Sequence, residues 1–182
     1  MSMKKVLIGL SGGVDSSVAA LILKEQGFEV IGITFQFYQD PQFEKHLYDA
    51  KQVAKKLDIE HSSIDLSKEF KEIVVDYFID SYLSGKTPNP CPYCNSHMKF
   101  YFLSKIAGEK NIPFIATGHY AEIKETQNGK RLFKGDNDLK SQEYFLALLN
   151  ESLLNQLIFP LSNLTKPQVR KIASEFGLEI SQ

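Results

Sequence analysis

Cysteine is scarce in this chain, and long apolar runs and an excess charge of either sign are missing from it. Two cysteines in 182 residues cannot make a disulfide framework, which favours a reducing compartment. The apolar run VLIGL near the N-terminus stops at Ser-Gly-Gly, too early for a signal-peptide core and far too short to span a membrane. The sequence therefore predicts a cytoplasmic protein without a membrane partner.

The charge balance also excludes a simple signal for nucleic-acid binding. The formal net charge is −1, whereas proteins that contact phosphate backbones usually carry a basic excess. Hydrophobic residues make up 43% of the chain, which is ordinary for a globular protein, and the length suits one domain. Any RNA partner must be inferred from other features of the sequence.

Apolar strand patterns alternate with amphipathic helix patterns along the chain. Asn128-Gly129 signals a β-hairpin between two short strands, which we expect at the edge of the sheet. This order predicts an α/β fold with a doubly wound, mostly parallel sheet, an edge hairpin and C-terminal helices. One domain is expected over residues 1–182, with the hairpin and helical tail in 121–182. We expect strands at 4–10, 28–37, 60–66 and 112–121, and helices at 15–26, 43–57, 68–84, 98–106 and 166–176.

The first candidate site is the loop GLSGGVDSS, which follows the first predicted strand and opens a helix. Its glycines allow close approach of an anion, and the helix amides and the hydroxyls of Ser11, Ser16 and Ser17 can hydrogen-bond phosphate. Asp15 either holds a Mg²⁺ ion on the phosphates or caps the helix. The loop lacks the lysine of a Walker A motif and the GxGxxG pattern. A plain strand–helix turn is the alternative without a ligand.

The second candidate site is TPNPCPYCNSHMKF, which holds both cysteines three residues apart. Half of a metal site, a redox dithiol and a reactive cysteine with a helper are all compatible with this spacing. We expect the loop to enter a helix at Asn95, whose dipole would lower the pKa of the Cys94 thiol. His97 completes a C-x₂-C-x₂-H pattern for structural zinc, without an evident fourth ligand. A thioredoxin-like CxxC is disfavoured because it normally follows a strand.

These motifs together carry a family resemblance. SGGVDSS resembles the pyrophosphatase loop (PP-loop) of enzymes that cleave ATP between its α- and β-phosphates. TPNPCPYCNSHMKF, ATGHYA, KSQEYFL, FPL and KPQVRKIASEFGL follow in that order, and the whole set resembles the tRNA-specific 2-thiouridylases over nearly the entire chain. The resemblance implies an adenine nucleotide α-hydrolase-like fold. It also implies an ATP-dependent sulfurtransferase that adenylates the 2-carbonyl oxygen of the wobble uridine in tRNA, replaces it with sulfur, and releases AMP and pyrophosphate.

The resemblance also implies roles for individual residues. The family's nucleophile falls on Cys94, with Cys91 and Asp15 as further catalytic residues, and the implied cofactors are ATP and Mg²⁺. The implied partners are tRNA and a sulfur donor protein that carries a persulfide. The implied ATP-binding residues are Gly9, Leu10, Ser11, Gly12, Gly13, Val14, Asp15, Ser16, Phe35 and Gly118. The implied tRNA-binding residues are Asn89, Pro90, Cys91, His119, Lys140, Ser141 and Gln142.

Three features depart from the usual family pattern. Cys91 replaces an Asp of many relatives and favours a soft metal, so Cys91 and Cys94 are candidate ligands of an iron–sulfur cluster. Ser141 also stands where relatives tend to have Asp. Family members continue into a segment with a second essential cysteine and into tRNA-binding domains, which we expect to be absent here. The chain is then either a truncated form or a short relative.

Simpler interpretations compete with these roles. A PP-loop pyrophosphatase that acts on a small molecule, by sulfur insertion or amidation, would fit the neutral charge. A non-catalytic nucleotide-binding module that recruits a partner is the second alternative, and Ser11, Asp15 and Cys94 argue against it. His119 could be a satisfied polar residue at a strand end. Tyr144 and Phe145 are expected in the hydrophobic core.

Overall fold

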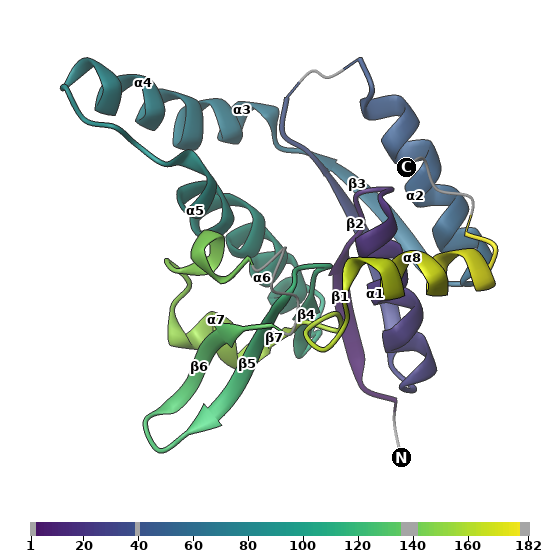
Figure 1. The fold of residues 1–182 in the computed structure, drawn as a ribbon. Helices are drawn as coiled ribbons and strands as arrows, with labels where there is room; N and C mark the ends of the chain where they lie inside the picture. Colours follow the sequence, from purple (N-terminus) through teal and green to yellow (C-terminus); the bar gives the residue numbers. More distant parts are fainter. Residues whose placement is uncertain (1–2, 39–40, 136–141, 179–182) are drawn as a thin grey trace.

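The central element of the fold is a five-stranded parallel sheet in the order β3-β2-β1-β4-β7 (Figure 1). The computed structural model describes residues 3–38, 41–135 and 142–178. All four strand pairs are parallel, as expected from the alternation of strands and helices. The strands are β1 (Lys5–Gly9), β2 (Glu29–Gln36), β3 (Glu60–Asp65), β4 (Phe114–Ala116) and β7 (Leu157–Ile158).

Helices cover both faces of this sheet, so the predicted doubly wound fold is confirmed. Successive side chains of β1 point to opposite faces, and Val6 and Ile8 belong to one apolar core while Leu7 belongs to the other. The first core is closed by α1 (Val14–Glu25), α2 (Phe43–Lys56) and α8 (Lys166–Glu175). The second is closed by α6 (Phe100–Glu109), η3 (Glu143–Leu146) and α7 (Glu151–Gln156).

Two long helical segments contain π-helical turns. The first comprises α3 (Ser67–Phe70), η1 (Lys71–Val75) and α4 (Asp76–Leu83), and it projects from the sheet at the upper left of Figure 1. The second comprises α5 (Pro90–Cys94), η2 (Asn95–Lys99) and α6, and it carries both cysteines. Helical backbone continues through each junction. π-helical turns inside helices are frequent at functional sites.

The predicted hairpin and C-terminal helix are both present. Strands β5 (Ala121–Thr126) and β6 (Gly129–Lys134) pair antiparallel through a turn in which Gly129 has a φ of 86°. Within the described residues they form a sheet of their own and do not extend the edge of the five-stranded sheet, where the hairpin was expected. Helix α8 begins after Thr165 with a capping box to Gln168, as the Thr165 and Pro167 signals predicted.

Some local predictions are wrong. Tyr144 and Phe145 are 62% and 37% exposed, and Leu146 is the residue of this segment that enters the core. The two-residue strand β7 and helix α7 were not predicted, although Asn150 caps α7 by accepting a hydrogen bond from the Leu153 N–H at 2.9 Å. None of the helices in the described ranges is long and apolar enough to cross a membrane.

Candidate active site

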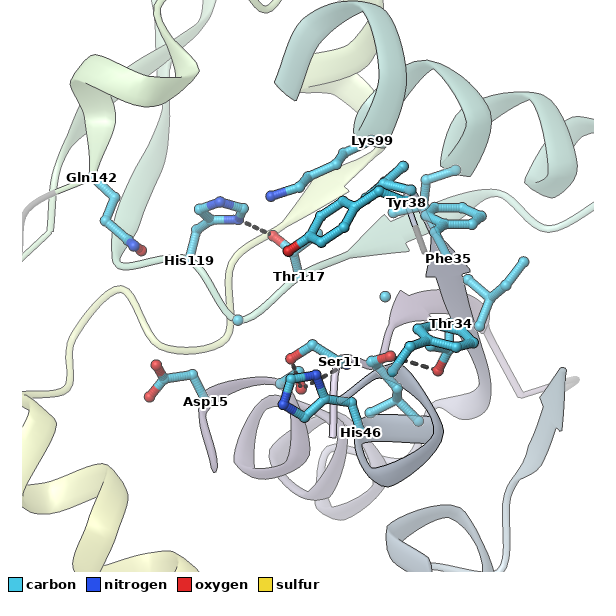
Figure 2. Close-up of a pocket in the computed structure, with 18 residues that line it drawn as sticks. Ser11, Asp15, Thr34, Phe35, Tyr38, His46, Lys99, Thr117, His119 and Gln142 are labelled. Carbon is cyan, nitrogen blue, oxygen red and sulfur yellow. Dashed lines mark hydrogen bonds between the residues drawn. The ribbon is translucent and has the colours of Figure 1, made fainter. Parts of the chain in front are cut away.

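A cavity of about 440 Å³ lies at the carboxyl ends of β1, β2 and β4 (Figure 2). The chain order reverses between β1 and β4, and such switch points are where parallel α/β sheets bind ligands. The loop after β1, the end of β2 and the loop after β4 supply most of the lining. These lining residues are Gly9, Leu10, Ser11, Asp15, Ser16, Ile33, Thr34, Phe35, Thr117, Gly118 and His119. Most of the ATP-binding residues implied by the sequence therefore meet in one cavity.

Two glycines make the backbone around this cavity compact. Gly12 has a φ of 75°, and a Cβ atom there would lie 2.3 Å from the carbonyl oxygen of His46. A Cβ atom on Gly118 would lie 2.7 Å from the backbone nitrogen of Ser16. The loop after β4 thus packs directly on the first turn of α1, whose amides are available to an anion. This close packing is a feature that a simple strand–helix turn does not need.

The serine hydroxyls of the loop divide into two groups. Ser17 is fully buried and its hydroxyl donates to the Gly13 carbonyl oxygen at 2.9 Å, so its expected phosphate contact is wrong. Ser11 and Ser16 line the cavity, with 3.1 Å between their Oγ atoms. The Ser11 N–H also donates to Ser16 Oγ at 3.1 Å. These internal bonds hold the loop in one shape before any ligand binds.

Asp15 is held by two groups that sequence analysis did not connect with it. Its Oδ1 accepts hydrogen bonds from Tyr120 Oη at 2.7 Å and from Lys166 Nζ at 2.5 Å. The helix it opens has no side-chain cap, so the capping role proposed for Asp15 is wrong. Burial, and then the hydrogen bond and charge of Asp15, raise the pKa of Tyr120, which therefore stays a protonated donor. The Mg²⁺ role of Asp15 remains a prediction.

Lys166 and Lys99 bring positive charge to this site from distant parts of the sequence. Lys166 is the first residue of α8, and its side chain is only 17% exposed. Lys99 ends the π-helical turn η2 and reaches over the cavity beside His119 (Figure 2). Both residues belong to motifs of the sequence, but neither was predicted to be part of the site. The one sequence signal that could have drawn attention to Lys166 is its position as the first residue of a capped helix.

His119 lines the cavity as a neutral side chain. Burial, and then the charge of Lys99, lower its pKa to about 4. The Nδ1 atom lies 2.7 Å from Thr117 Oγ1, and the ring contacts those of Phe100 and Phe159, which also contact each other. His119 is therefore both a packed residue at a strand end and a wall of the cavity. At pH 7 it can exchange hydrogen bonds but carries no charge.

The cysteine helix begins earlier than predicted. Asn89 is its N-cap and accepts a hydrogen bond from the Cys91 N–H at 3.1 Å, with Pro90 at the first helical position. The predicted cap, Asn95, is instead buried inside the helix and donates to the Phe145 carbonyl oxygen at 2.9 Å. Cys94 thus ends the first helical segment and gains no helix-start stabilisation. Burial raises the pKa of its thiol, so the predicted lowering is wrong.

The raised pKa of Cys94 leads to a prediction about its reactivity. At pH 7 the thiol is protonated, and we expect alkylation by iodoacetamide to be slow and to accelerate as the pH rises toward and beyond 9. The Cys91→Ser variant isolates this reaction, because Cys91 and Cys94 are the only cysteines of the chain. Mass spectrometry against time at several pH values gives the rate. A rate that is already maximal at pH 7 would contradict a raised pKa.

The structure brings together only part of the predicted iron–sulfur or zinc site at Cys91 and Cys94. Cys91 is exposed and Cys94 is partly buried, and their three-residue spacing in one helix places both on the same face. Among the described residues no group of three or more His, Cys, Asp or Glu side chains gathers to hold an ion. The His97 ring instead stacks on Tyr93. Two thiols cannot complete a four-thiolate cluster, so Cys91 and Cys94 supply at most part of an iron–sulfur site.

The implied tRNA-binding residues are partly brought together. Asn89 Nδ2 donates to Tyr144 Oη at 3.1 Å, which joins the cysteine helix to η3. Gln142 precedes η3, lines the cavity, and accepts a hydrogen bond from the Tyr120 N–H at 2.9 Å. Lys140 and Ser141 lie outside the described residues. The cysteines do not line the cavity, but Cys94 lies on the same helical segment as Lys99, roughly 7 Å away along its axis.

The glycine loop at the switch point of a parallel sheet defines a nucleotide-binding α/β domain of the PP-loop type. Residues 4–182 match the family model described as the tRNA methyl transferase HUP domain. The chain belongs to this family, that of the tRNA-specific 2-thiouridylases, as its motifs indicated.

Two curated relatives show how far the match extends. The chain is 43% identical to a tRNA-specific 2-thiouridylase MnmA of Clostridium perfringens, over 99% of this chain and 53% of that protein. It is 45% identical to the Rickettsia massiliae protein of the same name, over 97% of this chain and 51% of that protein. The chain therefore spans about half the length of the curated relatives it matches.

Two solved structures have the same fold. The U34-tRNA thiolase NcsA from Methanococcus maripaludis, described with its [4Fe-4S] cluster, matches with a TM-score of 0.64 and 22% identity, over 98% of this chain and 58% of that one. NMN synthetase from Francisella tularensis matches with a TM-score of 0.59 and 19% identity, over 99% of this chain and 66% of that one. These likenesses confirm the predicted PP-loop fold.

Proposed function

We propose that this chain is the catalytic domain of an ATP-dependent tRNA-uridine 2-sulfurtransferase, which replaces the 2-carbonyl oxygen of the wobble uridine with sulfur. One observation carries the proposal. The helical segment that bears Cys91 and Cys94 also supplies Lys99 to the wall of the nucleotide-sized cavity. A substrate that lies between the cysteines and the cavity can therefore react with both the sulfur-bearing group and the nucleotide. The names of the relatives at 43–45% identity support the same substrate.

The phosphate end of the cavity suits ATP with Mg²⁺. Bound there, ATP supplies the adenylyl group that turns a carbonyl oxygen into a leaving group. The first amides of α1 and the Lys166 ammonium bind negative phosphate charge, and the Asp15 carboxylate is the oxygen donor for Mg²⁺. Tyr120 orients that carboxylate by donating to it. Gly12 and Gly118 keep side chains out of the phosphate site.

Cys94 is the sulfur-bearing group in this proposal. Its thiol is protonated when the chain is alone, because burial raises its pKa. The positive charge of Lys99 acts in the opposite direction and favours the thiolate. Transfer also requires tRNA and a persulfide-carrying donor protein. Cys91, one turn earlier on the same helix face, is placed to contact the substrate or to share a metal with Cys94.

The products of ATP cleavage test the proposal. We expect AMP and pyrophosphate, formed faster when a tRNA transcript with a wobble uridine is present than when that uridine is replaced by cytidine. Chromatography of radiolabelled nucleotide gives both rates. ADP as the product would contradict a PP-loop reaction, since no Walker A lysine addresses the β- and γ-phosphates. AMP formation that does not respond to either transcript would favour the small-molecule alternative.

A further inference from the structure

Three aromatic rings form a parallel column beside the cysteines. The Tyr77 and Tyr93 rings lie 3.9 Å apart between centroids with planes 9° apart. The Tyr93 and His97 rings follow at 4.0 Å and 16°. Aromatic side chains in proteins more often meet edge-to-face or offset, with centroids farther apart. This column therefore has the spacing and orientation of stacked bases.

The column has one buried part and one exposed end. Tyr77 on α4 and Tyr93 on α5 are partly buried, and Tyr93 has a ring on each side of it. His97 is exposed, and its Nδ1 atom lies 3.1 Å from the Tyr93 carbonyl oxygen, which fixes the ring orientation. Within the part of the chain that the structure describes, the ring contacts end at His97. Tyr101, 52% exposed, follows one turn later along the same helix.

The sequence segment that carries the exposed end is basic. The stretch from residue 81 to residue 108 contains three lysines and neither Asp nor Glu, although the whole chain has a net charge of −1. On α4, which carries Tyr77, Asp76 pairs with Lys71 at 3.0 Å and Asp80 is exposed. An exposed aromatic ring on a segment with lysines and no acidic residue suits a nucleobase that is attached to phosphate. A protein partner with an apolar surface would gain nothing from the lysines.

We propose that His97 binds an unpaired base of an RNA loop by stacking, so that the column Tyr77–Tyr93–His97 is extended by one ring. The inference rests on the proposed function, because it places a nucleotide adjacent to the target uridine. Cys94 lies three residues before His97 on the same helical segment, so the two side chains share one side of it and a base on His97 brings the next nucleotide toward the thiol. Proteins that read single-stranded RNA hold splayed bases on aromatic rings in this way. The stack fixes position and selects no particular base.

Fluorescence of 2-aminopurine tests the stack directly. The probe is a short RNA hairpin with a tRNA anticodon loop in which 2-aminopurine replaces the base on either side of the wobble uridine. We expect the wild-type chain to quench the fluorophore at one of these positions. His97→Ala should abolish the quenching and weaken binding about fivefold to tenfold. His97→Phe should retain both, since the stack needs a flat ring and no hydrogen bond.

The controls separate stacking from general loss of binding. Tyr48→Ala removes a tyrosine that is 61% exposed on α2, outside the column, and should behave as wild type. Equal quenching by wild type and His97→Ala, or loss of quenching in His97→Phe, would overturn the stack and leave the proposed function intact. A wild-type chain that quenches neither position would also overturn the stack. The proposed function is then judged by AMP formation alone.

Discussion

Replacing Gly118 by alanine should disrupt the proposed ATP site. The new Cβ atom would lie 2.7 Å from backbone atoms of Asp15 and Ser16, which cannot swing aside as a flexible side chain would. We expect the start of α1 to be displaced, the free energy of unfolding to fall by about 1–3 kcal/mol, and ATP affinity to fall at least tenfold. Calorimetric titration with a non-hydrolysable ATP analogue and thermal unfolding measure the two effects.

Gly108→Ala is the matched control for this change. Gly108 lies in α6, and a Cβ atom there would meet nothing within 4 Å. Because alanine favours helix more than glycine, this variant should be up to about 1 kcal/mol more stable and bind the analogue as the wild type does. Unchanged affinity in Gly118→Ala would show that the loop after β4 does not shape the nucleotide site.

Replacing Lys166 by glutamine should slow ATP cleavage strongly. The substitution removes a largely buried ammonium that lies 2.5 Å from Asp15, and with it the positive charge paired with this carboxylate, while Tyr120 still donates to it. We expect AMP formation to fall by about 10²-fold, the usual effect of losing one electrostatic group that stabilises charge in the transition state. The loss should be greater in rate than in ATP affinity, because in the proposed reaction charge develops on the departing pyrophosphate.

Lys171→Gln provides the comparison on the same helix. The Lys171 side chain is 76% exposed and contacts Glu175 at 3.7 Å, so its removal should change the rate little. Steady-state rates of AMP formation, measured at saturating and at subsaturating ATP, separate the effect on ATP affinity from the effect on turnover. If Lys166→Gln retained the wild-type rate, its ion pair with Asp15 would serve packing of α8 and not the reaction.

The fold was predictable because its signals are local. The longer strands and helices are indicated by apolar runs or by a helical period of 3.6 residues, whereas the short β7 and α7 carry no such signal. Gly27 and Gly177 end their helices with positive φ values, as glycines do. The predicted start of the helix that carries the cysteines was wrong. Asn95 was expected to begin this helix, whereas Asn89 caps it and Asn95 lies inside it, where it donates to the Phe145 carbonyl oxygen of η3.

The sequence by itself determined the parallel α/β fold, the phosphate loop and the family, because these depend on residues that are adjacent or regularly spaced. Only the tertiary structure decided the electrostatics of the site. Asp15 and Lys166 are 151 positions apart, and nothing local in either segment indicates that they meet. The protonation of Cys94 and His119 likewise depends on burial by side chains from several elements. A pKa reports the whole surroundings of a group, and those exist only after the chain has folded.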